Sequence, residues 1–534
     1  MKWKSDSYHL DIQIHRGKPY GLLRNSYRED GKVKKETLCR LPAGLSLGQL
    51  RNMQAAIQGN TMPKEDFKIT KSREYGASFV CSQIMKALKV DKAIYSRPSE
   101  EWVRACLAMI AGRLVFAGSK LSLSHCGSYS ALWEVFGIDN ADVNVHCYAA
   151  MDKLLERQED IQQTLAKKHL HDGTLVLYDI TSCYMEGEYA DSELVEFGYN
   201  RDRKRGHEQI VISLLCTRDG CPVAVDVFAG NTKDETTVLD KIEEIHTKYG
   251  VENIIFVGDR GMVTQTKYEN IDHETTKVIS ALSHNAIKTL DEKGTIQIGM
   301  FDEKNIVEVI DGDKRYCLCK NPEMEAKEAA TRQVLLKKTC DDLDQIIKCT
   351  KKTKYTKEMR AGKAVNKYKM GKFIVFEGSG ENLKYTINYE NVEREARLDG
   401  CYIVYTDVPP EIMTAIQTVE NYKSLMHVEQ AFRNMKTVHL ELRPIFHKTD
   451  DRIRCHVFIC MLAYYVMWHI NQKLQPFFET DGVGALRKFT FNYVFENLKS
   501  IRKETIEICG VQSYAITTPT DEPLNILQLL EVRL

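Results

Sequence analysis

The sequence predicts an α/β protein whose main sheet is interrupted by an inserted domain, and three changes of pattern along the chain support this. Short runs of alternating apolar and polar residues fill positions 8–38, which is typical of a small β-rich unit. Apolar residues recur at helical spacing between about 74 and 170, which indicates an all-helical module. From Thr174 onward, apolar strand-like runs surround a single helical stretch, which indicates a sheet.

The predicted sheet begins with three strands, of which the second and third form a hairpin. The strands are expected at 175–178, 209–216, 222–228, 253–257 and 277–282. One helix is expected between the third and fourth strands, opened by a capping box at 232–235 and ending near Tyr249. This order of elements, β-β-β-α-β followed by one more strand, is that of a ribonuclease-H-like sheet.

Residues 284–400 break this pattern with short strands, a charged helical stretch and a run of basic residues. A ribonuclease-H-like sheet still requires a helix that carries its last acidic residue, so we interpret this stretch as an inserted domain. The required helix follows a strand at 402–405. Pro409 and Pro410 are expected at its start, and it is apolar on one face from Glu411 onward.

Composition favours a soluble protein of a reducing compartment. Apolar residues make up 43% of the chain and charged residues 28%, as in globular proteins. No apolar region follows the first residues, so we expect no signal peptide. The sixteen cysteines include no Cys-x-x-Cys pair, so we expect reduced thiols and a cytoplasmic location. The apolar stretch 457–470 is shorter than the roughly 20 residues that cross a bilayer, and we expect a buried core helix there.

The chain carries 74 basic and 74 acidic residues, so its formal net charge is zero. This balance excludes a protein that coats nucleic acid through bulk positive charge, and any such contact must come from local patches. Residues 1–50 hold ten Lys or Arg against five Asp or Glu, and residues 351–372 hold nine against Glu358 alone. Either patch could equally be a solvated face.

Acidic residues stand at two strand ends and on the last helix. Asp179 and Asp259 each follow an apolar strand, where a carboxylate is held rigidly with its tip in a cleft. Either one alone is more often a turn residue, and the pair is more informative. Residues seven apart on a helix return to within about 20° of the same direction, so Tyr422, Glu429 and Lys436 share one face. That spacing also fits a surface helix with Glu429 in solvent.

The segment 422–436 resembles the Tyr-x2-Arg-x3-Glu-x6-Lys signature of a large group of bacterial insertion-sequence transposases of the DDE type. The segments around Asp179 and Asp259 resemble the two acidic strands of the same group, and 228–234 resembles the turn into its first helix. The similarity extends over about residues 70–475.

The match to this signature has one departure, because Leu425 occupies the position of its arginine. In the family, that arginine is thought to hold a DNA phosphate near the cut end. Arg433 is a candidate substitute, although it points elsewhere on an ideal helix.

The resemblance implies a transposase that binds the ends of its insertion sequence, cuts them and joins them to target DNA. Asp179, Asp259 and Glu429 would be its catalytic residues and would hold two divalent ions, Mg²⁺ or Mn²⁺, which prefer carboxylate oxygens. Tyr422 and Lys436 would contact phosphates beside the ions. No His/Cys cluster with the sequence spacing of a zinc site competes with these acids. The expected partners are transposon-end DNA, target DNA and a second copy of the chain on that DNA.

Two alternatives remain open. A metal-dependent nuclease on the same fold would use the acids without strand transfer, and a transposase-derived DNA-binding protein would have given up catalysis. The presence of all three acids counts against the second alternative. In either active form, we expect the basic run 351–372 to lie along DNA near the active site, with contacts from Lys363, Lys367 and Lys369.

The expected architecture is a ribonuclease-H-like catalytic core, interrupted by a partly β insertion domain and preceded by two smaller modules. The units are a small β-rich N-terminal unit (1–70), a helical DNA-binding module (71–170), the first part of the core (171–283), the insertion domain (284–400), the second part of the core (401–475) and a C-terminal helical tail (476–534).

Overall fold

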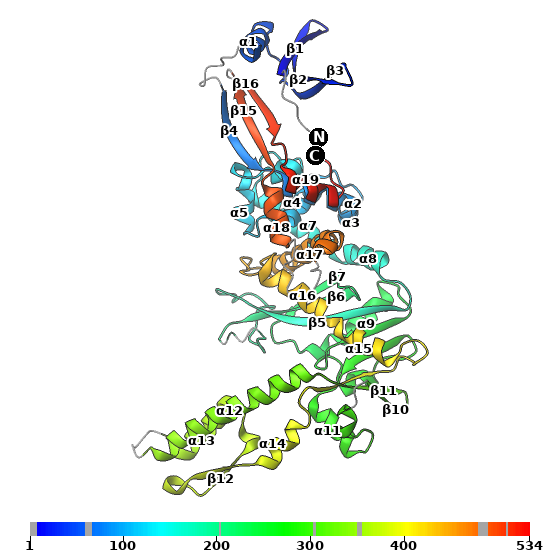
Figure 1. Ribbon diagram of the computed structural model, residues 1–534, viewed down its shortest axis with the longest axis vertical. Coiled ribbons are helices and arrows are strands. Elements are labelled where there is room, and N and C mark those ends of the chain that lie inside the picture. Colours follow the sequence, from blue (N-terminus) through cyan, green and yellow to red (C-terminus); the bar gives the residue numbers. More distant parts are fainter. Residues whose placement is uncertain are drawn as a thin grey trace.

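The large mixed sheet is the centre of the computed structural model, which describes residues 8–58, 67–201, 204, 206–302, 306–349, 355–478, 490–508 and 511–534. Its eight strands have the order β10-β11-β14-β9-β8-β5-β6-β7. In Figure 1 a layer of helices lies above this sheet, two small β units lie above the helices, and an arm extends below the sheet. The protein is thus a mixed α/β molecule with a helical layer on one side of the sheet.

Five strands of this sheet are the ones that the sequence predicts. They are β5 (Thr174–Tyr184), β6 (Gln209–Thr217), β7 (Pro222–Ala229), β8 (Ile254–Gly258) and β9 (Thr276–Ala281). β8 runs parallel to both β5 and β9, whereas β6 and β7 form an antiparallel hairpin beside β5. Nearly every residue of β6 is buried, because both faces of the sheet are covered.

The helix between β7 and β8 begins later than the sequence predicts. The expected capping box at 232–235 does not form. Instead, a 3₁₀ turn, η4 (Asp234–Thr236), precedes α9 (Val238–Thr247), whose N-cap residue Thr237 makes no side-chain cap hydrogen bond. The Asp234 side chain forms an ion pair with Arg201. An acidic residue that the pattern assigned to a helix start therefore serves a long-range contact.

The expected start of the insertion domain at residue 284 is corrected by two strands. β10 (Val307–Asp311) and β11 (Lys314–Lys320) extend the large sheet, and β11 pairs with β14 (Cys401–Thr406), which pairs in turn with β9. These strands look like isolated short runs in the sequence because β14, which joins them to the rest of the sheet through β11, lies far along the chain. The connection from β9 to β10 contains α11 (His284–Glu292), and α10 (Gln265–Glu269) joins β8 to β9.

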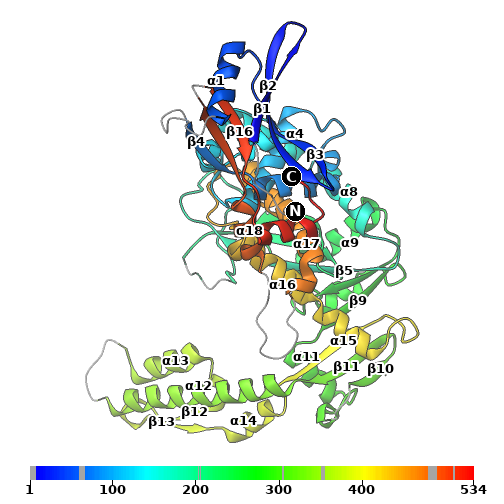
Figure 2. The ribbon, with the colours of Figure 1, turned by 45° about the horizontal axis from the view of Figure 1, so that its top comes forward.

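Between β11 and β14 the chain builds a separate unit, which we call the arm. It comprises α12 (Pro322–Lys348), α13 (Lys357–Tyr368), the paired strands β12 (Ile374–Glu377) and β13 (Lys384–Ile387), and α14 (Tyr389–Ala396). Leu343, Val365 and Leu383 are among the buried residues of its own small core. Figures 1 and 2 both show the arm projecting away from the rest of the molecule.

The helix expected from Glu411 onward is shorter and segmented. Pro409 and Pro410 lie before it, and α15 (Ala415–Lys423) begins where Thr414 and Gln417 form a reciprocal capping box. α16 (Leu425–Arg433) follows after a break at Ser424, and the π-helical turn η8 (Asn434–Val438) ends the segment. The helix starts at Ala415 and not at the proline pair. The capping box satisfies the first free N–H groups there, whereas the prolines can only preset the backbone angle φ.

The helical module predicted for 71–170 is present. Its helices are α2 (Gly76–Ala87), α3 (Val90–Ile94), α4 (Glu101–Val115), α5 (Lys120–Ser124), α6 (Leu132–Val135), α7 (Ala150–Glu156) and α8 (Gln158–His169). The long helix α17 (Asp450–Phe478) packs between this module and β7. By length and composition α17 could cross a membrane, but 83% of its apolar window is buried inside the protein. It includes the apolar stretch that the sequence predicts to be a core helix.

Two small β units lie at the end of the molecule opposite the arm (Figures 1 and 2). The first contains β1 (Tyr8–His15), β2 (Lys18–Glu29), β3 (Lys32–Arg40) and α1 (Leu47–Gln58), around a core that includes Leu10 and Leu50. It agrees with the β-rich unit expected at the N-terminus.

The second β unit corrects the expected helical tail at 476–534. β15 (Arg502–Ile508) pairs with both β16 (Val511–Ile516) and β4 (Phe67–Glu74), so the sheet joins the two ends of the chain. Among the described residues of this region, the helices are the end of α17, α18 (Phe491–Lys499) and α19 (Asp521–Leu529), and 479–489 and 509–510 lie outside them. The third strand comes from the N-terminal part of the chain, which no local pattern reveals.

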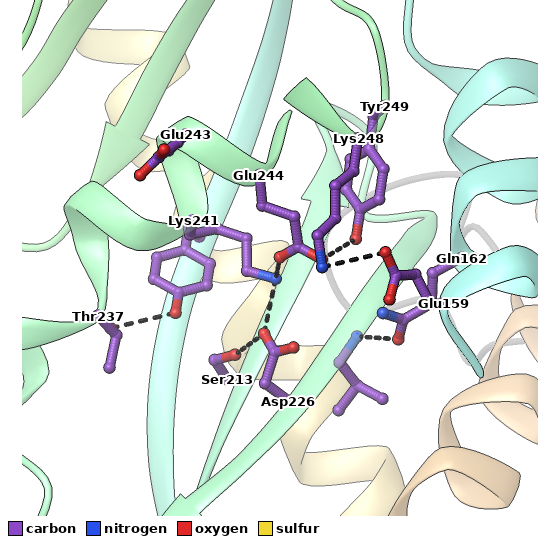
Figure 3. Close-up of polar contacts among 12 residues, drawn as sticks. Glu159, Gln162, Ser213, Asp226, Thr237, Lys241, Glu243, Glu244, Lys248 and Tyr249 are labelled. Carbon is purple, nitrogen blue, oxygen red and sulfur yellow. Dashed lines mark hydrogen bonds and ion pairs between the residues drawn. The ribbon is translucent and has the colours of Figure 1, made fainter. Parts of the chain in front are cut away.

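The face of the sheet that α9 covers holds a buried network of charges (Figure 3). Lys241 of α9 is only 3% exposed and forms ion pairs with Asp226 of β7, at 2.7 Å, and with Glu244. Ser213 donates a hydrogen bond to Asp226 at 2.9 Å, and Tyr249 donates one to Glu244 at 3.1 Å. Each charge in this network has a protein partner, as buried charges require.

Candidate active site

Three acidic residues from three separate elements line one cleft of about 440 Å³. Asp179 lies in β5, Asp259 follows β8 directly, and Glu429 lies on α16. The parallel register pairs Tyr178 with Gly258, so the next residue on each strand is one of the two aspartates. The sequence predicts that this strand ends just before Asp179. In the structure, β5 continues to Tyr184 because it keeps pairing with β6.

The three acids differ in their exposure to solvent, because Asp179 is half-buried and the other two are not. Burial raises the pKa of Asp179 from 3.8 to about 7; the N–H of Ile180 and the guanidinium of Arg201 lower it, and nearby Asp259 and Glu429 raise it. Asp259 and Glu429 themselves are exposed. Since carboxylates that share a site disfavour each other's ionised form, this cluster is suited to an added cation.

The helix that carries Glu429 brings two further predicted residues to the acids. Tyr422 donates a hydrogen bond from its hydroxyl to Asp259 Oδ1 at 3.2 Å. Lys436 is buried, lines the cleft and donates from Nζ to Thr181 Oγ1 at 2.6 Å. The expected common face of Tyr422, Glu429 and Lys436 is thus turned toward the cleft, even though the helix breaks at Ser424 and widens into a π-helical turn at 434–438.

Arg433 and Leu425 differ in their surroundings. Arg433 is exposed and lines the cleft, although an ideal helix would point it elsewhere. Leu425, at the position of the signature arginine, is half-buried against the apolar core. The arginine nearest in sequence to the predicted acid therefore lies where a phosphate contact could be made, and Leu425 serves packing.

Five polar or charged residues that the sequence did not single out for the site also line the cleft. They are Thr181, Arg201, Asp234, Thr437 and Arg443. Asp234 lies in the segment 228–234 that resembles the transposase turn, so the sequence held one signal for it. Arg201 comes from the connection between β5 and β6, in which residues 202, 203 and 205 lie outside the described part of the chain, and no pattern marks it. The guanidinium of Arg201 forms an ion pair with Asp234.

The described part of the basic run predicted to contact DNA, 355–372, lies on the arm and does not line this cleft. Lys363 Nζ sits 4.0 Å from the ring centre of Tyr355, and Lys367 forms an ion pair with Asp342 of α12 at 3.4 Å. Lys369 follows α13 in a left-handed conformation. The first part of the run, 351–354, lies outside the described residues.

Comparison with known proteins identifies a family whose domain includes the three acids of the cleft. Residues 170–466, more than half of the chain, match the family described as the transposase DDE domain. A solved structure of a piggyBac transposase synaptic complex with hairpin DNA is distantly similar over 80% of each chain, with 8% identity and a TM-score of 0.36. No curated protein matched the chain significantly. Since the family match spans all three cleft acids, the chain belongs to the DDE-domain transposases.

Proposed function

We propose that the protein binds the ends of its own insertion sequence, cleaves the DNA there and joins the 3′ ends to a target. The single observation that carries this proposal is the meeting of Asp179, Asp259 and Glu429 in one cleft of a DDE-family domain. The strand order β9-β8-β5-β6-β7, with β6 and β7 antiparallel, supports assigning these strands to a ribonuclease-H-like core. We assign β14 and the helices α15 to α17 to its second part.

The residues of the cleft fit two divalent cations, with Mg²⁺ or Mn²⁺ the expected occupants. Asp179, Asp259 and Glu429 supply carboxylate oxygens, which these ions prefer, while several of their water ligands can stay in place. The ions would activate a water or 3′-hydroxyl nucleophile and stabilise the leaving oxygen. Tyr422 orients the Asp259 carboxylate through its hydroxyl, and burial raises the pKa of Asp179 more than the N–H of Ile180 and the guanidinium of Arg201 lower it.

Positive side chains around the cleft would hold the DNA. Arg433 and Lys436 flank the acids and would contact phosphates beside the scissile bond, positioning it without reading sequence. Lys363, Lys367 and Lys369 of the arm would contact a more distant stretch of the same DNA. The helical module α2 to α8 is the proposed end-binding unit, and the protein would act in the cytoplasm.

A homodimer assembled on DNA follows from the proposed reaction. Joining both ends of one element to one target requires two cleavage sites held together, and each chain contributes one cleft. The expected assembly therefore forms on paired ends.

The test is incubation of the purified chain with duplex DNA of its element's end, with a supercoiled target plasmid and with Mg²⁺ or EDTA. Nicking at the element boundary and joined products, both dependent on the metal, are expected. Cleavage without any joining would indicate a nuclease, and end binding without cleavage would indicate a DNA-binding protein. Either result would overturn the proposal, and an Asp259→Asn variant should bind the ends without cutting them.

A further inference from the structure

Three potential metal ligands outside the cleft meet where α8, the β6–β7 turn and α17 come together. His169 is the last residue of α8, Cys221 ends the turn before β7, and His469 lies on α17. One ligand atom from each lies within 4.8 Å of the others. The sequence shows no zinc-type spacing here, because the three positions are far apart along the chain.

We propose that His169, Cys221 and His469 bind one transition-metal ion, with Zn²⁺ as the expected occupant. Thiolate and imidazole are ligands of zinc and similar ions, whereas Mg²⁺ and Ca²⁺ take oxygen ligands. Three protein ligands leave a fourth position for water. None of these residues lines the cleft of the acidic cluster, so this site would be separate from the catalytic ions.

The ring nitrogens of both histidines are arranged for such a role. His169 Nε2 is 3.0 Å from the hydroxyl of Tyr465, so Nδ1 would be the nitrogen that binds the metal. His469 Nε2 is buried and has no hydrogen-bond partner among the described residues. A buried polar atom without a partner is costly, and a metal bond would satisfy it. Tyr465 would then support His169 as an outer partner, in the way that metal-bound histidines usually require.

The protonation states agree with this assignment at two of the three ligands. Burial lowers the pKa of His169 and of His469 to about 4, so both rings are neutral at pH 7 and can donate a lone pair. Burial raises the pKa of Cys221 to about 12. Binding must therefore break its S–H bond, form a sulfur–metal bond and release the proton to solvent. The ammonium of Lys168 favours that ionisation and is itself held by Leu88 O and Tyr465.

A metal at this site would fix the β6–β7 turn against α17. Trp468 already donates a hydrogen bond to Asp219 O of the same turn at 3.1 Å. On its other side the turn presses on α16. Gly220, with φ at 85°, lies so close to His427 that an added Cβ would come within 2.8 Å of the His427 Cβ. Since α16 carries Glu429, we infer a structural clamp next to the catalytic helix.

The experiment is titration of the metal-stripped full chain with Co²⁺, followed by absorption spectroscopy. A thiolate ligand gives a sulfur-to-cobalt charge-transfer band in the near ultraviolet, which carboxylates do not give. One equivalent of Co²⁺ should produce this band in the wild type, in Asp179→Asn and in Cys317→Ser, a buried cysteine of β11 that serves as the matched control. The band should be absent from Cys221→Ser.

Two further measurements keep the proposal testable if Cys221→Ser does not fold. Tyr465→Phe retains all three ligands and should weaken Zn²⁺ binding about 10- to 100-fold, the range for an outer partner of a metal ligand. Zn²⁺ should also raise the Tm of the wild type and of Cys317→Ser. Absence of the band from the wild type, its survival in Cys221→Ser, or unchanged Zn²⁺ affinity in Tyr465→Phe would each overturn the assignment.

Discussion

The two faces of the large sheet differ in how their charged side chains are paired, and two neighbouring residues of β5 lie on opposite faces. Tyr178 donates a hydrogen bond to Thr237 on the side that α9 covers, at 3.1 Å, whereas Asp179 lines the cleft on the other side. On the α9 side, Lys241 is enclosed by Asp226 and Glu244. In the cleft, three acids line the wall together with Arg201, whose ion-pair partner is Asp234.

The charges on the α9 side are paired with each other and stabilise the fold, whereas the acids of the cleft are available to bind a ligand. Burial alone would lower the pKa of Lys241, but Asp226 and Glu244 raise it, so the ammonium stays charged and satisfied. The pKa of Asp179 is raised because its burial is not offset in the same way. Substitutions on the α9 side should therefore affect stability, and substitutions in the cleft should affect chemistry.

The largest effect is expected in the cleft. Replacing Asp179, Asp259 or Glu429 by Ala should lower cleavage at least about 10⁴-fold, the order lost when one member of a catalytic set that acts as a unit is removed. End binding should change little, because phosphate contacts dominate affinity. Asp240→Ala, an exposed acid of α9, is the control and should keep both activities. A parallel loss of binding and cleavage would assign the acids a structural role, and the contrast between the faces would fail.

The second prediction concerns the α9 face. Lys241→Met leaves Asp226 and Glu244 without their cation and should destabilise the protein by about 3–5 kcal/mol, measured by urea unfolding. Lys248→Met is the control: its side chain is 47% exposed in its ion pair with Glu159, and it should cost less than about 1 kcal/mol.

Adding Asp226→Asn to the Lys241→Met variant should restore part of the lost stability, because one unpaired, partly buried charge is removed. Equal, small costs for the two lysine variants would mean that the buried network does not stabilise the fold.

A third prediction extends the contrast to the arm, where basic residues are exposed to solvent. Changing Lys363, Lys367 and Lys369 together to Gln should flatten the log–log salt dependence of end binding by as much as ~2.7, at about 0.9 for each phosphate contact. Lys367 can contact a phosphate only if it leaves its ion pair with Asp342, so its contribution to the slope depends on that exchange. Affinity is measured across a salt series.

A triple variant of exposed lysines on the neighbouring helix α12, with Lys327, Lys337 and Lys338 changed to Gln, removes the same charge from the same unit. It should leave the slope nearly unaltered. Identical slopes for both triple variants and the wild type would show that the basic run is only a solvated face.

The last prediction is a pH dependence of stability in the absence of metal. The native state holds the Asp179 proton more tightly than the unfolded chain does, since its pKa is about 7 against 3.8. The wild type should therefore lose stability relative to Asp179→Asn as pH rises from about 4 to 7, with a constant gap above that range. Urea unfolding in EDTA at several pH values measures the gap. A gap that narrows with rising pH would mean that the pKa of Asp179 is not raised.

The sequence by itself determined the elements whose signals are local. Alternation of apolar and polar residues marked the three N-terminal strands, and short apolar runs marked β5 to β9. Helical periodicity marked the module before β5, and a continuous apolar stretch marked the helix α17. It also put Asp259 after a strand and Glu429 on a helix, and the resemblance around them predicted the DDE family that the comparison shows. These features follow from neighbouring residues, because side-chain direction repeats with the geometry of each element.

The tertiary structure decided everything that depends on residues far apart in the chain. It placed β10 and β11 in the large sheet, paired β15 with β4, and joined Arg201 to Asp234 where a capping box was expected. It also gathered His169, Cys221 and His469 into one cluster. Strand pairing and buried polar contacts satisfy groups on different segments, so their partners are fixed only when the whole chain packs.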